Sequence, residues 1–412
     1  MGYKNFSIAV MVISVVLVVT TLLMGCAQQK PSAPVQSGPI AINVGIVNDI
    51  TGPVAPWGMG GLPYYKAWLD LFNKKGFQVG DKTYIFNQIY EDGQSAPEPT
   101  AAAAKKLVYG ENCKFIIGYF FVWHSQIAAV TTPAKAIFMC RTGTEFNYEP
   151  QKEPYTVFAT AQVEQWAAAI MTLAETNPKY KKIGILESTL AKKNADYINP
   201  YLDQAGVRYV WEYYPYPTTD YVPYLTRLAE DGCDIVYSPS DIGASFAIAK
   251  LRWEMGYKNW IVGHGGSMVH PAIYDQAVGH EAAQGIVSDE YYSPDFKKTD
   301  VNPEFIQQCK DAESIVKQTD KDPFVYKGWT SWAPVHYQIL AQAMQKAGSV
   351  DDTDAIMKAI RGGTFDTNVG KITMCGEKTY GSPVVAPCPG AVCHMVGNSL
   401  EYLGEHPIKF IP

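Results

Sequence analysis

The chain lacks the short motifs that mark most enzymes and nucleic-acid-binding proteins. No basic block follows residue 30 and the formal net charge is -6, so nothing favours a nucleic-acid partner. No GxSxG turn stands at a strand end, and no GKS or GKT follows a glycine-rich stretch, which argues against nucleophilic hydrolases and nucleotide enzymes. The histidines show no HxH or HxxxH spacing and the cysteines no CxxC pair, so we expect no metal and no cofactor.

Cysteine is sparse, with eight in the chain. Three fall in or beside apolar runs and are expected to be buried thiols: Cys113, Cys140 and Cys233. Cys375, Cys388 and Cys393 lie close together near the C-terminus, which favours one disulfide among them and leaves the pairing open. A metal cluster with His394 is the less favoured interpretation, because the spacing lacks a paired CxxC.

The first 25 residues have the pattern of an export signal. A lysine precedes an almost uncharged apolar run from Phe6 to Met24, so we assign a signal peptide to residues 1–25. The run ends in LMGC, which resembles a bacterial lipobox and predicts lipidation of Cys26. An uncleaved membrane anchor is the alternative, because the run is long enough to span a bilayer. Residues 26–40 are small, polar and proline-bearing like a flexible tether, and either interpretation places the folded body outside the cytoplasm.

From Ile42 onward, short β-branched runs alternate with longer amphipathic ones. Strands are predicted at 42–47, 84–90, 114–120, 136–140, 181–187, 207–216, 233–240, 259–266 and 284–292. Helices are predicted at 62–75, 97–108, 125–133, 163–175, 194–205, 221–230 and 244–255. This repeated βαβ pattern restarts near Val163, which predicts an α/β fold of two doubly wound parallel-sheet lobes.

A block of helices without a sheet of its own follows Tyr292. Helices are predicted at 303–319, 331–346 and 351–360, before a turn-rich, weakly stranded tail. Such helices must pack on a sheet that is already built. The chain therefore returns to the first lobe and crosses once more, which predicts a hinge of several strands.

Three stretches of the sequence carry a resemblance to a known family. After the signal and lipobox come VGIVNDITGPVAPWG at 44–58, YEDGQSAPEPTAAAAKKLV at 90–108 and KFIIG at 114–118. In this order they resemble the extracytoplasmic solute-binding proteins that serve ABC transporters for leucine, isoleucine and valine. The resemblance covers about residues 41–375 and fades in the tail. It implies a small-molecule ligand, an ABC transporter permease as partner, a lipid-anchored monomer facing the periplasm or cell exterior, and no catalysis.

The resemblance also implies two α/β lobes that are joined by three crossovers and close over a ligand. It places the crossovers near Phe158–Ala161, Val287–Glu290 and Lys371–Met374. Lobe 1 is then 41–159 plus 289–371, and lobe 2 is 160–288 plus 372–412. Open α/β sheets bind ligands beyond the C-terminal ends of their strands, so the loops at those ends are the candidate site.

Two loops of the first lobe differ from those of amino-acid binders. Family members that bind α-amino acids hold the carboxylate with hydroxyls and backbone N–H groups of this lobe. Here Phe121 and Val122 stand about where the carboxylate-holding serine is expected. The next loop offers Arg141, Thr142 and Thr144 instead, and arginine is well shaped for a bidentate carboxylate contact. A surface ion pair is the alternative role for Arg141.

The second lobe lacks the usual ammonium partner. Gly265 stands where amino-acid binders tend to have a glutamate, with His264 beside it in the same predicted ligand loop. Glu187 ends one predicted strand and Asp241 follows another, so either is a candidate partner for a cationic group.

Aromatic residues complete the predicted site. Trp57 and Trp123 each follow a strand and are predicted to contact the ligand, whereas Phe121 has packing in the core as an equal alternative. Aromatic walls with one arginine and two threonines suit an apolar or aromatic carboxylate. A branched-chain amino acid or amide binder and a ligand-sensing lipoprotein are the alternatives, and an exported α/β enzyme is the least favoured.

Overall fold

The computed structural model describes most of the chain from Gly38 onward. The described ranges are 38–52, 55–118, 123–141, 147–216, 218–239, 242–264, 275, 277–290, 307–308, 310–312, 314–316, 327–368, 370–387, 391–397 and 399–404. The body, Ile40–Pro412, forms one compact unit. The predicted signal peptide and Cys26 lie outside the described residues. Within the described ranges, none of the helices has both the length and the apolarity that a membrane span requires.

The first sheet is built almost entirely from parallel strands. Its strands are β1 (Ile40–Asn48), β2 (Phe77–Val79), β3 (Lys82–Asp92), β4 (Phe115–Gly118), β5 (Ile137–Cys140) and β6 (Thr156–Phe158). Their order in the sheet is β2-β3-β1-β4-β5-β6, and all pairs are parallel except the edge pair β2 and β3. Residues Val44–Asn48 of β1 are buried without alternation, as expected for a strand with both faces covered.

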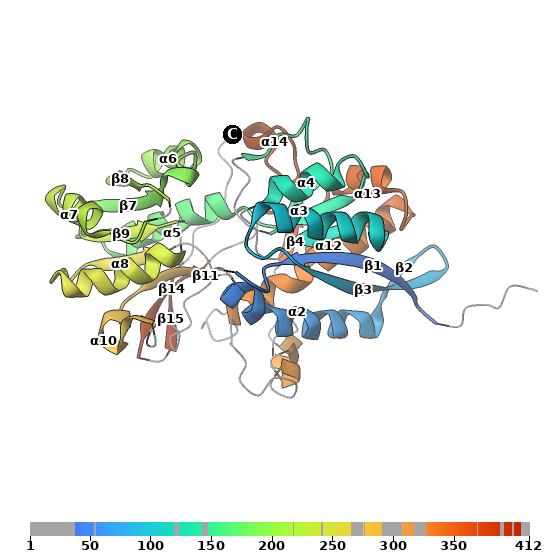
Figure 1. Cartoon of the computed structure of the whole chain (residues 1–412), viewed down its shortest axis with the longest axis horizontal. Coiled ribbons are helices and arrows are strands. Elements are labelled where there is room, and N and C mark those ends of the chain that lie inside the picture. Colours follow the sequence, from blue (N-terminus) through green and yellow to red (C-terminus); the bar gives the residue numbers. More distant parts are fainter. Residues whose placement is uncertain are drawn as a thin grey trace, which may run out of the picture. The chain divides into compact units, whose positions relative to one another are not determined.

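Helices cover both faces of this sheet. They are α2 (Ala55–Lys75), α3 (Pro97–Lys105), a π-helical turn (Lys106–Gly110), α4 (His124–Thr131), α12 (Lys327–Ala347) and α13 (Thr353–Ile360). In Figure 1, α3 and α4 lie on one face, while α2 lies on the other face, where it packs against α12. The long return of the chain to this sheet, predicted from the late helices, is therefore present in α12.

The second sheet has the same doubly wound plan. Its strands are β7 (Ile183–Ser188), β8 (Tyr209–Tyr214), β9 (Ile235–Ser238), β10 (Ile261–His264), β11 (Val287–Glu290), β14 (Ala391–Val396) and β15 (Ser399–Gly404). Their order is β15-β14-β11-β10-β9-β7-β8, with β14 and β15 antiparallel at one edge. The helices are α5 (Gln162–Thr176), a short 3-10 turn (Thr189–Ala191), α6 (Asn194–Gln204), α7 (Val222–Glu230), α8 (Ile242–Glu254) and α10 (His280–Ala283).

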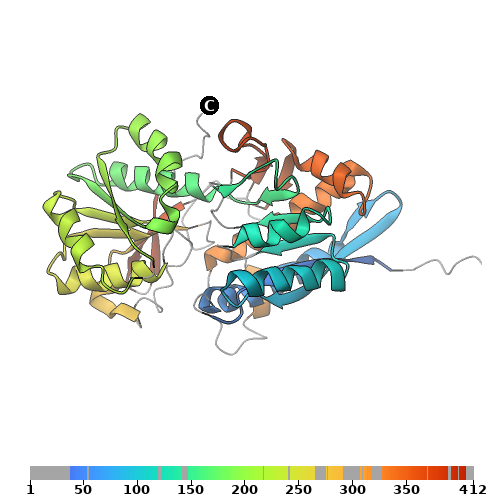
Figure 2. The same ribbon diagram turned by 45° about the horizontal axis from the view of Figure 1, so that its top comes forward.

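Two hydrophobic clusters mark the two faces of the second sheet. One joins α5 and α6 to the sheet through residues such as Ile170, Ile198 and Ile185. The other lies under α7 and α8 and contains Leu225 and Ile248. Figures 1 and 2 show these helices on the two sides of the strands. The predicted α/β class with two lobes is thus present, and the described antiparallel pairs of the two large sheets lie toward their edges.

The chain leaves the first sheet directly after β6. Ala161 belongs to the core of the first sheet and Val163 to the core of the second, so the chain passes from one core to the other between these residues. The predicted second crossing, at Val287–Glu290, is strand β11 of the second sheet, and residues 291–306 after it lie outside the described ranges.

The last crossing lies later than predicted. Residues Lys371–Met374 do not cross, because β13 (Gly370–Thr373) pairs with β12 (Thr364–Thr367) as a separate hairpin. After the one-turn helix α14 (Glu377–Tyr380), Val385 still bridges Phe158 at the edge of the first sheet. The chain joins the second sheet at Ala391, so the change of sheet falls between Val385 and Ala391.

Candidate functional site

Two aspartates hold the loop that follows β1. Asp92 Oδ1 accepts hydrogen bonds from the backbone N–H groups of Ile50 (2.9 Å) and Thr51 (3.2 Å). Burial raises the pKa of Asp92, but these bonds and one from the Thr51 hydroxyl hold it below its ordinary value. Asp49 is fully buried and accepts from Ser95 N (2.7 Å), and burial raises its pKa to about 6. A phosphate cradle needs available N–H groups, and the Asp92 carboxylate already occupies those of Ile50 and Thr51, which argues against a nucleotide here.

The glycine-rich stretch after this loop begins a helix. Gly58 lies so close to the end of β1 that a Cβ there would come within 1.8 Å of Asp49 O. Asn48 Nδ2 donates to Gly58 O (2.9 Å), which fixes the first turn of α2 against the strand. Trp57 was predicted in a loop but lies in this first turn, because α2 already begins at Ala55. Its side chain lies outside the described part of the structure.

Arg141 lies at the C-terminal end of β5 and is 2% exposed. Its Nη1 donates to the hydroxyl of Tyr65 on α2 (2.6 Å), and its backbone N–H donates to Gly118 O at the end of β4 (3.2 Å). The surface ion pair considered from the sequence does not fit this burial. This bond places the end of β4 beside the end of β5, and the residues that follow each of them, 119–122 and 142–146, lie outside the described ranges.

Arg141 is joined to a buried group of tyrosines. Gln88 on β3 donates from Nε2 to the hydroxyl of Tyr337 on α12 and accepts at Oε1 from the hydroxyl of Tyr90. Burial raises the pKa of Tyr65 and of Tyr90, and the nearby Tyr337 hydroxyl raises both pKa values further. The guanidinium of Arg141 lowers the pKa of Tyr65 only in part. The Tyr65 and Tyr90 hydroxyls therefore stay neutral, and Arg141 brings a positive charge to the Tyr65 hydroxyl.

Trp123 and His124 come at the start of α4. Trp123 is half-buried and packs against the core of the first sheet. His124 is 2% exposed, with Nε2 3.4 Å from Glu153 Oε2 and its ring edge-on to Phe158. His124 is thus a buried partner of a carboxylate.

Glu187 lies at the C-terminal end of β7 and is fully buried. Its Oε1 accepts from Ser188 N (2.8 Å) and its Oε2 from Asn194 Nδ2 (3.3 Å) at the start of α6. Together with burial, its charge raises the pKa of Tyr213 to about 12. The carboxylate predicted as a partner for a cationic group therefore also holds the start of α6.

A second acid of this lobe was not predicted from the sequence. The Tyr237 hydroxyl on β9 donates to Asp289 Oδ1 on β11 (3.0 Å). The tyrosine ring crosses the intervening strand at Gly263, where a Cβ would lie 2.6 Å from Tyr237 Cδ2. Burial and Asp289 raise the pKa of Tyr237 well above its usual range. The available signal was the acidic pair in the otherwise apolar strand QGIVSDE.

Most of the predicted ligand residues have no described side chain. Six lie outside the described residues: Phe121, Val122, Thr142, Thr144, Asp241 and Gly265. His264 ends β10, but nothing is described of its side chain or that of Trp57. The structure brings Trp123, Arg141 and Glu187 to the C-terminal ends of strands, as predicted, with Glu187 in the other sheet.

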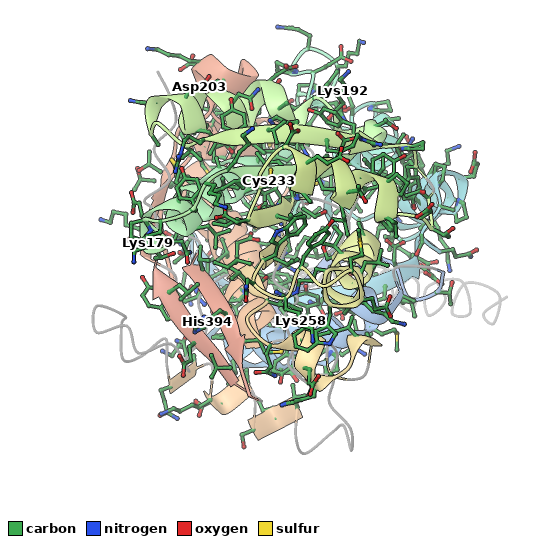
Figure 3. The ribbon with its side chains drawn as sticks, turned by 90° about the vertical axis from the view of Figure 1, so that its left-hand side faces the viewer. Lys179, Lys192, Asp203, Cys233, Lys258 and His394 are labelled. Atoms are coloured by element: carbon green, nitrogen blue, oxygen red, sulfur yellow. The ribbon has the colours of Figure 1, made fainter. Side chains whose placement is uncertain are left out.

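One disulfide was predicted among Cys375, Cys388 and Cys393, but Cys375 is a free thiol and takes no part in one. The Cys375 thiol donates to Val385 O (3.4 Å), and burial raises its pKa to about 12. Cys388 lies outside the described residues. The predicted buried thiols are buried: Cys113, Cys140 and Cys233. His394, labelled in Figure 3, lies on β14, and its Nε2 is 3.2 Å from Glu401 Oε2. No metal-binding cluster occurs among the described residues.

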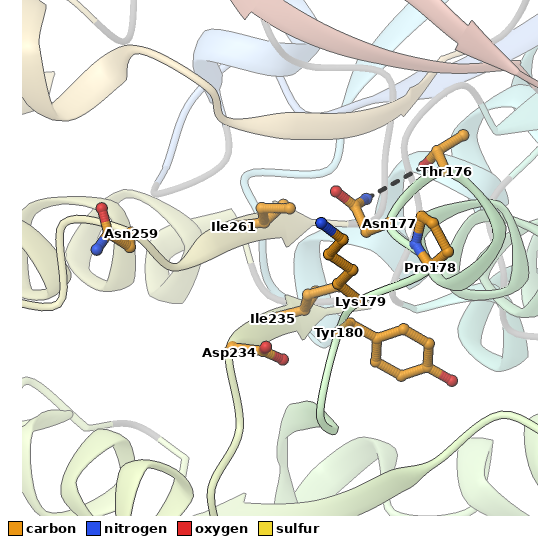
Figure 4. Close-up of a pocket in the computed structure, with 9 residues that line it drawn as sticks. All are labelled: Thr176, Asn177, Pro178, Lys179, Tyr180, Asp234, Ile235, Asn259 and Ile261. Carbon is orange, nitrogen blue, oxygen red and sulfur yellow. Dashed lines mark hydrogen bonds between the residues drawn. The ribbon is translucent and has the colours of Figure 1, made fainter.

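A shallow hollow of about 400 Å³ lies at the opposite ends of the second-sheet strands. It is lined by residues before β9 and β10 and after α5, among them Tyr180, Asp234 and Asn259 (Figure 4). The Asp234 carboxylate already accepts a hydrogen bond from the backbone N–H of Lys181 (3.0 Å). No buried charged side chain lines the hollow, so it lacks the features of a solute site.

Two doubly wound α/β lobes in one chain, with polar and charged side chains at the C-terminal ends of the strands, define a two-lobed binding protein. The chain matches the family model described as periplasmic binding protein over residues 41–383, and it belongs to that family. Members of the family are extracytoplasmic solute-binding proteins of ABC transporters and are not enzymes.

Individual relatives agree with this assignment. The chain is 22% identical over 342 residues to the Leu/Ile/Val-binding protein BraC3 of Rhizobium johnstonii, covering 81% of this chain and 87% of that protein. The leucine-binding protein LivK of Thermotoga maritima has the same fold, with a TM-score of 0.69 at 16% identity over 88% of this chain and 97% of that one. A solute-binding protein of Rhodopseudomonas palustris in complex with p-hydroxybenzoic acid has a TM-score of 0.69 at 18% identity, covering 90% and 98%.

Proposed function

We propose that this protein captures an apolar or aromatic carboxylate between its two lobes and delivers it to an ABC importer of the branched-chain amino acid type. The observation that carries the proposal is Arg141, a buried guanidinium at the C-terminal end of a central strand. In this position a cation meets a ligand beyond the sheet without competition from bulk water.

The surroundings of Arg141 suit a carboxylate. The Tyr65 hydroxyl accepts a hydrogen bond from Arg141 Nη1 and so fixes the orientation of the guanidinium without adding a negative charge. A guanidinium presents five N–H donors in a planar fork that matches a carboxylate. The loops that start at Gly118 and Arg141 contribute Phe121, Val122, Thr142 and Thr144 to the proposed contacts.

The second lobe offers little for an α-ammonium group. Gly265 has no side chain with which to pair it, and Glu187 already accepts from Ser188 and Asn194. A buried charge without a partner is costly, so a ligand with an ammonium group would bind at a penalty. The structurally similar protein that holds p-hydroxybenzoic acid supports a ligand without that group.

A branched-chain amino acid is the second candidate. The name of the Rhizobium johnstonii relative, a Leu/Ile/Val-binding protein, favours it. Glu187 and Asp241 would then be the partners of the ammonium group. Trp57, Trp123 and His264 would line the site with either ligand.

The proposal includes the organisation predicted from the sequence. Cys26 carries the lipid anchor, the protein acts as a monomer, and the lobes meet at the crossings after Phe158 and near Glu290. We place the third crossing between Val385 and Ala391, where the chain changes sheet, and not at Lys371–Met374.

Calorimetric titration of the purified protein with 4-hydroxybenzoate, benzoate and leucine tests the proposal. Both aromatic acids should bind, and leucine should bind at least about tenfold more weakly. Arg141→Met should weaken 4-hydroxybenzoate binding about 100-fold, because two hydrogen bonds to a charged group contribute about 3 kcal/mol. Arg141→Lys keeps the positive charge but loses the planar pair of donors. Its affinity for 4-hydroxybenzoate should lie between those of the wild type and Arg141→Met.

A matched control uses another arginine. Arg227 is exposed and pairs with Glu212 (2.5 Å), so Arg227→Met should bind 4-hydroxybenzoate like the unmodified protein. Thermal unfolding of each variant establishes that it is folded at the temperature of the titration. Tight binding of leucine without binding of either aromatic acid, or wild-type binding by folded Arg141→Met, would refute the proposal.

A further inference from the structure

Glu164 lies where the chain passes from one hydrophobic core to the other. Ala161 belongs to the first core and Val163 to the second, and Glu164 follows in the first turn of α5. The final crossing comes near this point as well, because Val385 bridges Phe158. A contact formed here therefore joins two crossing segments.

Tyr380 makes that contact. Its hydroxyl donates to Glu164 Oε1 (2.6 Å), although the two residues are 216 positions apart. Tyr380 belongs to the first core, and its ring stacks on Tyr197 of α6 with centroids 5.4 Å apart and planes at 16°. One side chain that comes shortly before the last crossing thus contacts both α5 and α6 on one face of the second sheet.

The backbone around Tyr380 fixes its direction. Tyr380 ends the one-turn helix α14 and donates from its N–H to Gly376 O (2.7 Å). Gly376 and Gly381 flank this turn with φ of +96° and +76°, values that favour glycine. Cys375 pairs with Val385 through both backbone hydrogen bonds, which ties the turn to the crossing segment.

Glu164 is a carboxyl group in an apolar setting. It is 2% exposed, and its Oε2 is buried without a hydrogen-bond partner. Burial raises the pKa of Glu164 to about 7, while the hydrogen bond from Tyr380 acts in the opposite direction. Three titratable groups interact with the Glu164 carboxyl: Tyr380 on α14, Tyr197 on α6 and Cys375 before α14.

We propose that Glu164 and Tyr380 are positioning residues of the hinge: their contact holds the crossing segments together while the carboxyl is protonated, and its ionisation releases them. An ionised carboxylate with one unpaired oxygen needs water, and water reaches this oxygen only when the contact opens. The inference does not depend on which solute the protein binds.

Hydrogen exchange of the purified protein without added solute tests the proposal, with rates corrected for the intrinsic effect of pH. Exchange in residues 159–166 and 375–386 should rise about tenfold between pH 6 and pH 8, with its midpoint near pH 7. In Glu164→Gln, which keeps the acceptor oxygen but does not titrate, the rise should disappear. In Tyr380→Phe the midpoint should move to higher pH, because a hydrogen bond that lowers the pKa is lost.

Glu175→Gln is the matched control, since Glu175 lies on the same helix but is exposed. It should show the wild-type pH profile. A merely structural role for Tyr380 would speed exchange without moving the midpoint, and that result would overturn the proposal. A flat wild-type profile between pH 5.5 and pH 8.5, or a wild-type profile in Glu164→Gln, would overturn it equally. If a variant fails to fold, the pH profile of the wild-type protein still tests the proposal by itself.

Discussion

Asp49, directly after β1, and Asp92, at the end of β3, should act on stability with opposite dependence on pH. Burial raises the pKa of Asp49 from 3.8 to about 6, so the folded state holds this proton more tightly than the unfolded state. The resulting stabilisation is complete below pH 3.8 and is lost as the pH rises through about 6. Each pKa unit corresponds to about 1.4 kcal/mol, so the free energy of unfolding should fall by up to about 3 kcal/mol across this range.

Asp49→Asn should remove this dependence. In the wild type, Asp49 Oδ1 accepts a hydrogen bond from Ser95 N at 2.7 Å. The asparagine amide has an oxygen that can accept the same bond, but it does not titrate. Urea unfolding at several pH values measures the difference between variant and wild type, in which other titrating groups cancel. The variant should gain up to about 3 kcal/mol relative to wild type between pH 4 and pH 8.

Asp92→Asn provides the contrasting control. The pKa of Asp92 is held low, so its stabilisation is present at neutral pH and is lost on acidification. This variant should therefore lose stability relative to wild type as the pH rises from 3 to 6. Stability curves of Asp49→Asn that run parallel to wild type from pH 4 to pH 8 would refute the reasoning about burial.

Three further outcomes are expected. Gly58→Ala should cost about 3 kcal/mol or prevent folding, measured by urea unfolding, because its Cβ would come within 1.8 Å of Asp49 O. Gly263→Ala should cost about 2 kcal/mol in the same assay, because its Cβ would lie 2.6 Å from the Tyr237 ring. The Cys375 thiol, with its pKa raised to about 12, should resist alkylation at pH 8 in the native protein and react once urea unfolds it. Mild loss of stability in either glycine variant, or rapid native alkylation, would contradict these expectations.

Much of the fold was predictable because it follows from local patterns. The apolar run INVGIV and the helical spacing after Leu62 each predict one element, and β1 and α2 contain them. The three-residue strands β2 and β6 were missed, since such short segments carry little periodicity. The last crossing was placed too early, because the pairing of β12 with β13 depends on register and not on composition.

The site was predictable only in outline. Strand ends can be located from the sequence, so Arg141 and Glu187 were placed at the correct ends of their strands. Their partners were not predicted, because Tyr65 lies 76 positions from Arg141 in the chain. Asp289 was missed for the same reason, since its partner Tyr237 lies 52 positions away and reaches it across Gly263.

By itself the sequence determined the α/β class, the two repeated units and the absence of catalytic and nucleotide motifs, because periodicity and motif spacing are properties of neighbouring residues. Only the tertiary structure decided that Arg141 is buried against a neutral hydroxyl, and that Asp49 and Asp92, 43 positions apart, share one loop with opposite pKa directions. It also decided that Tyr380 meets Glu164 at the crossing segments. The strength of a charge and the value of a pKa depend on burial and on distant partners, which the order of residues alone does not specify.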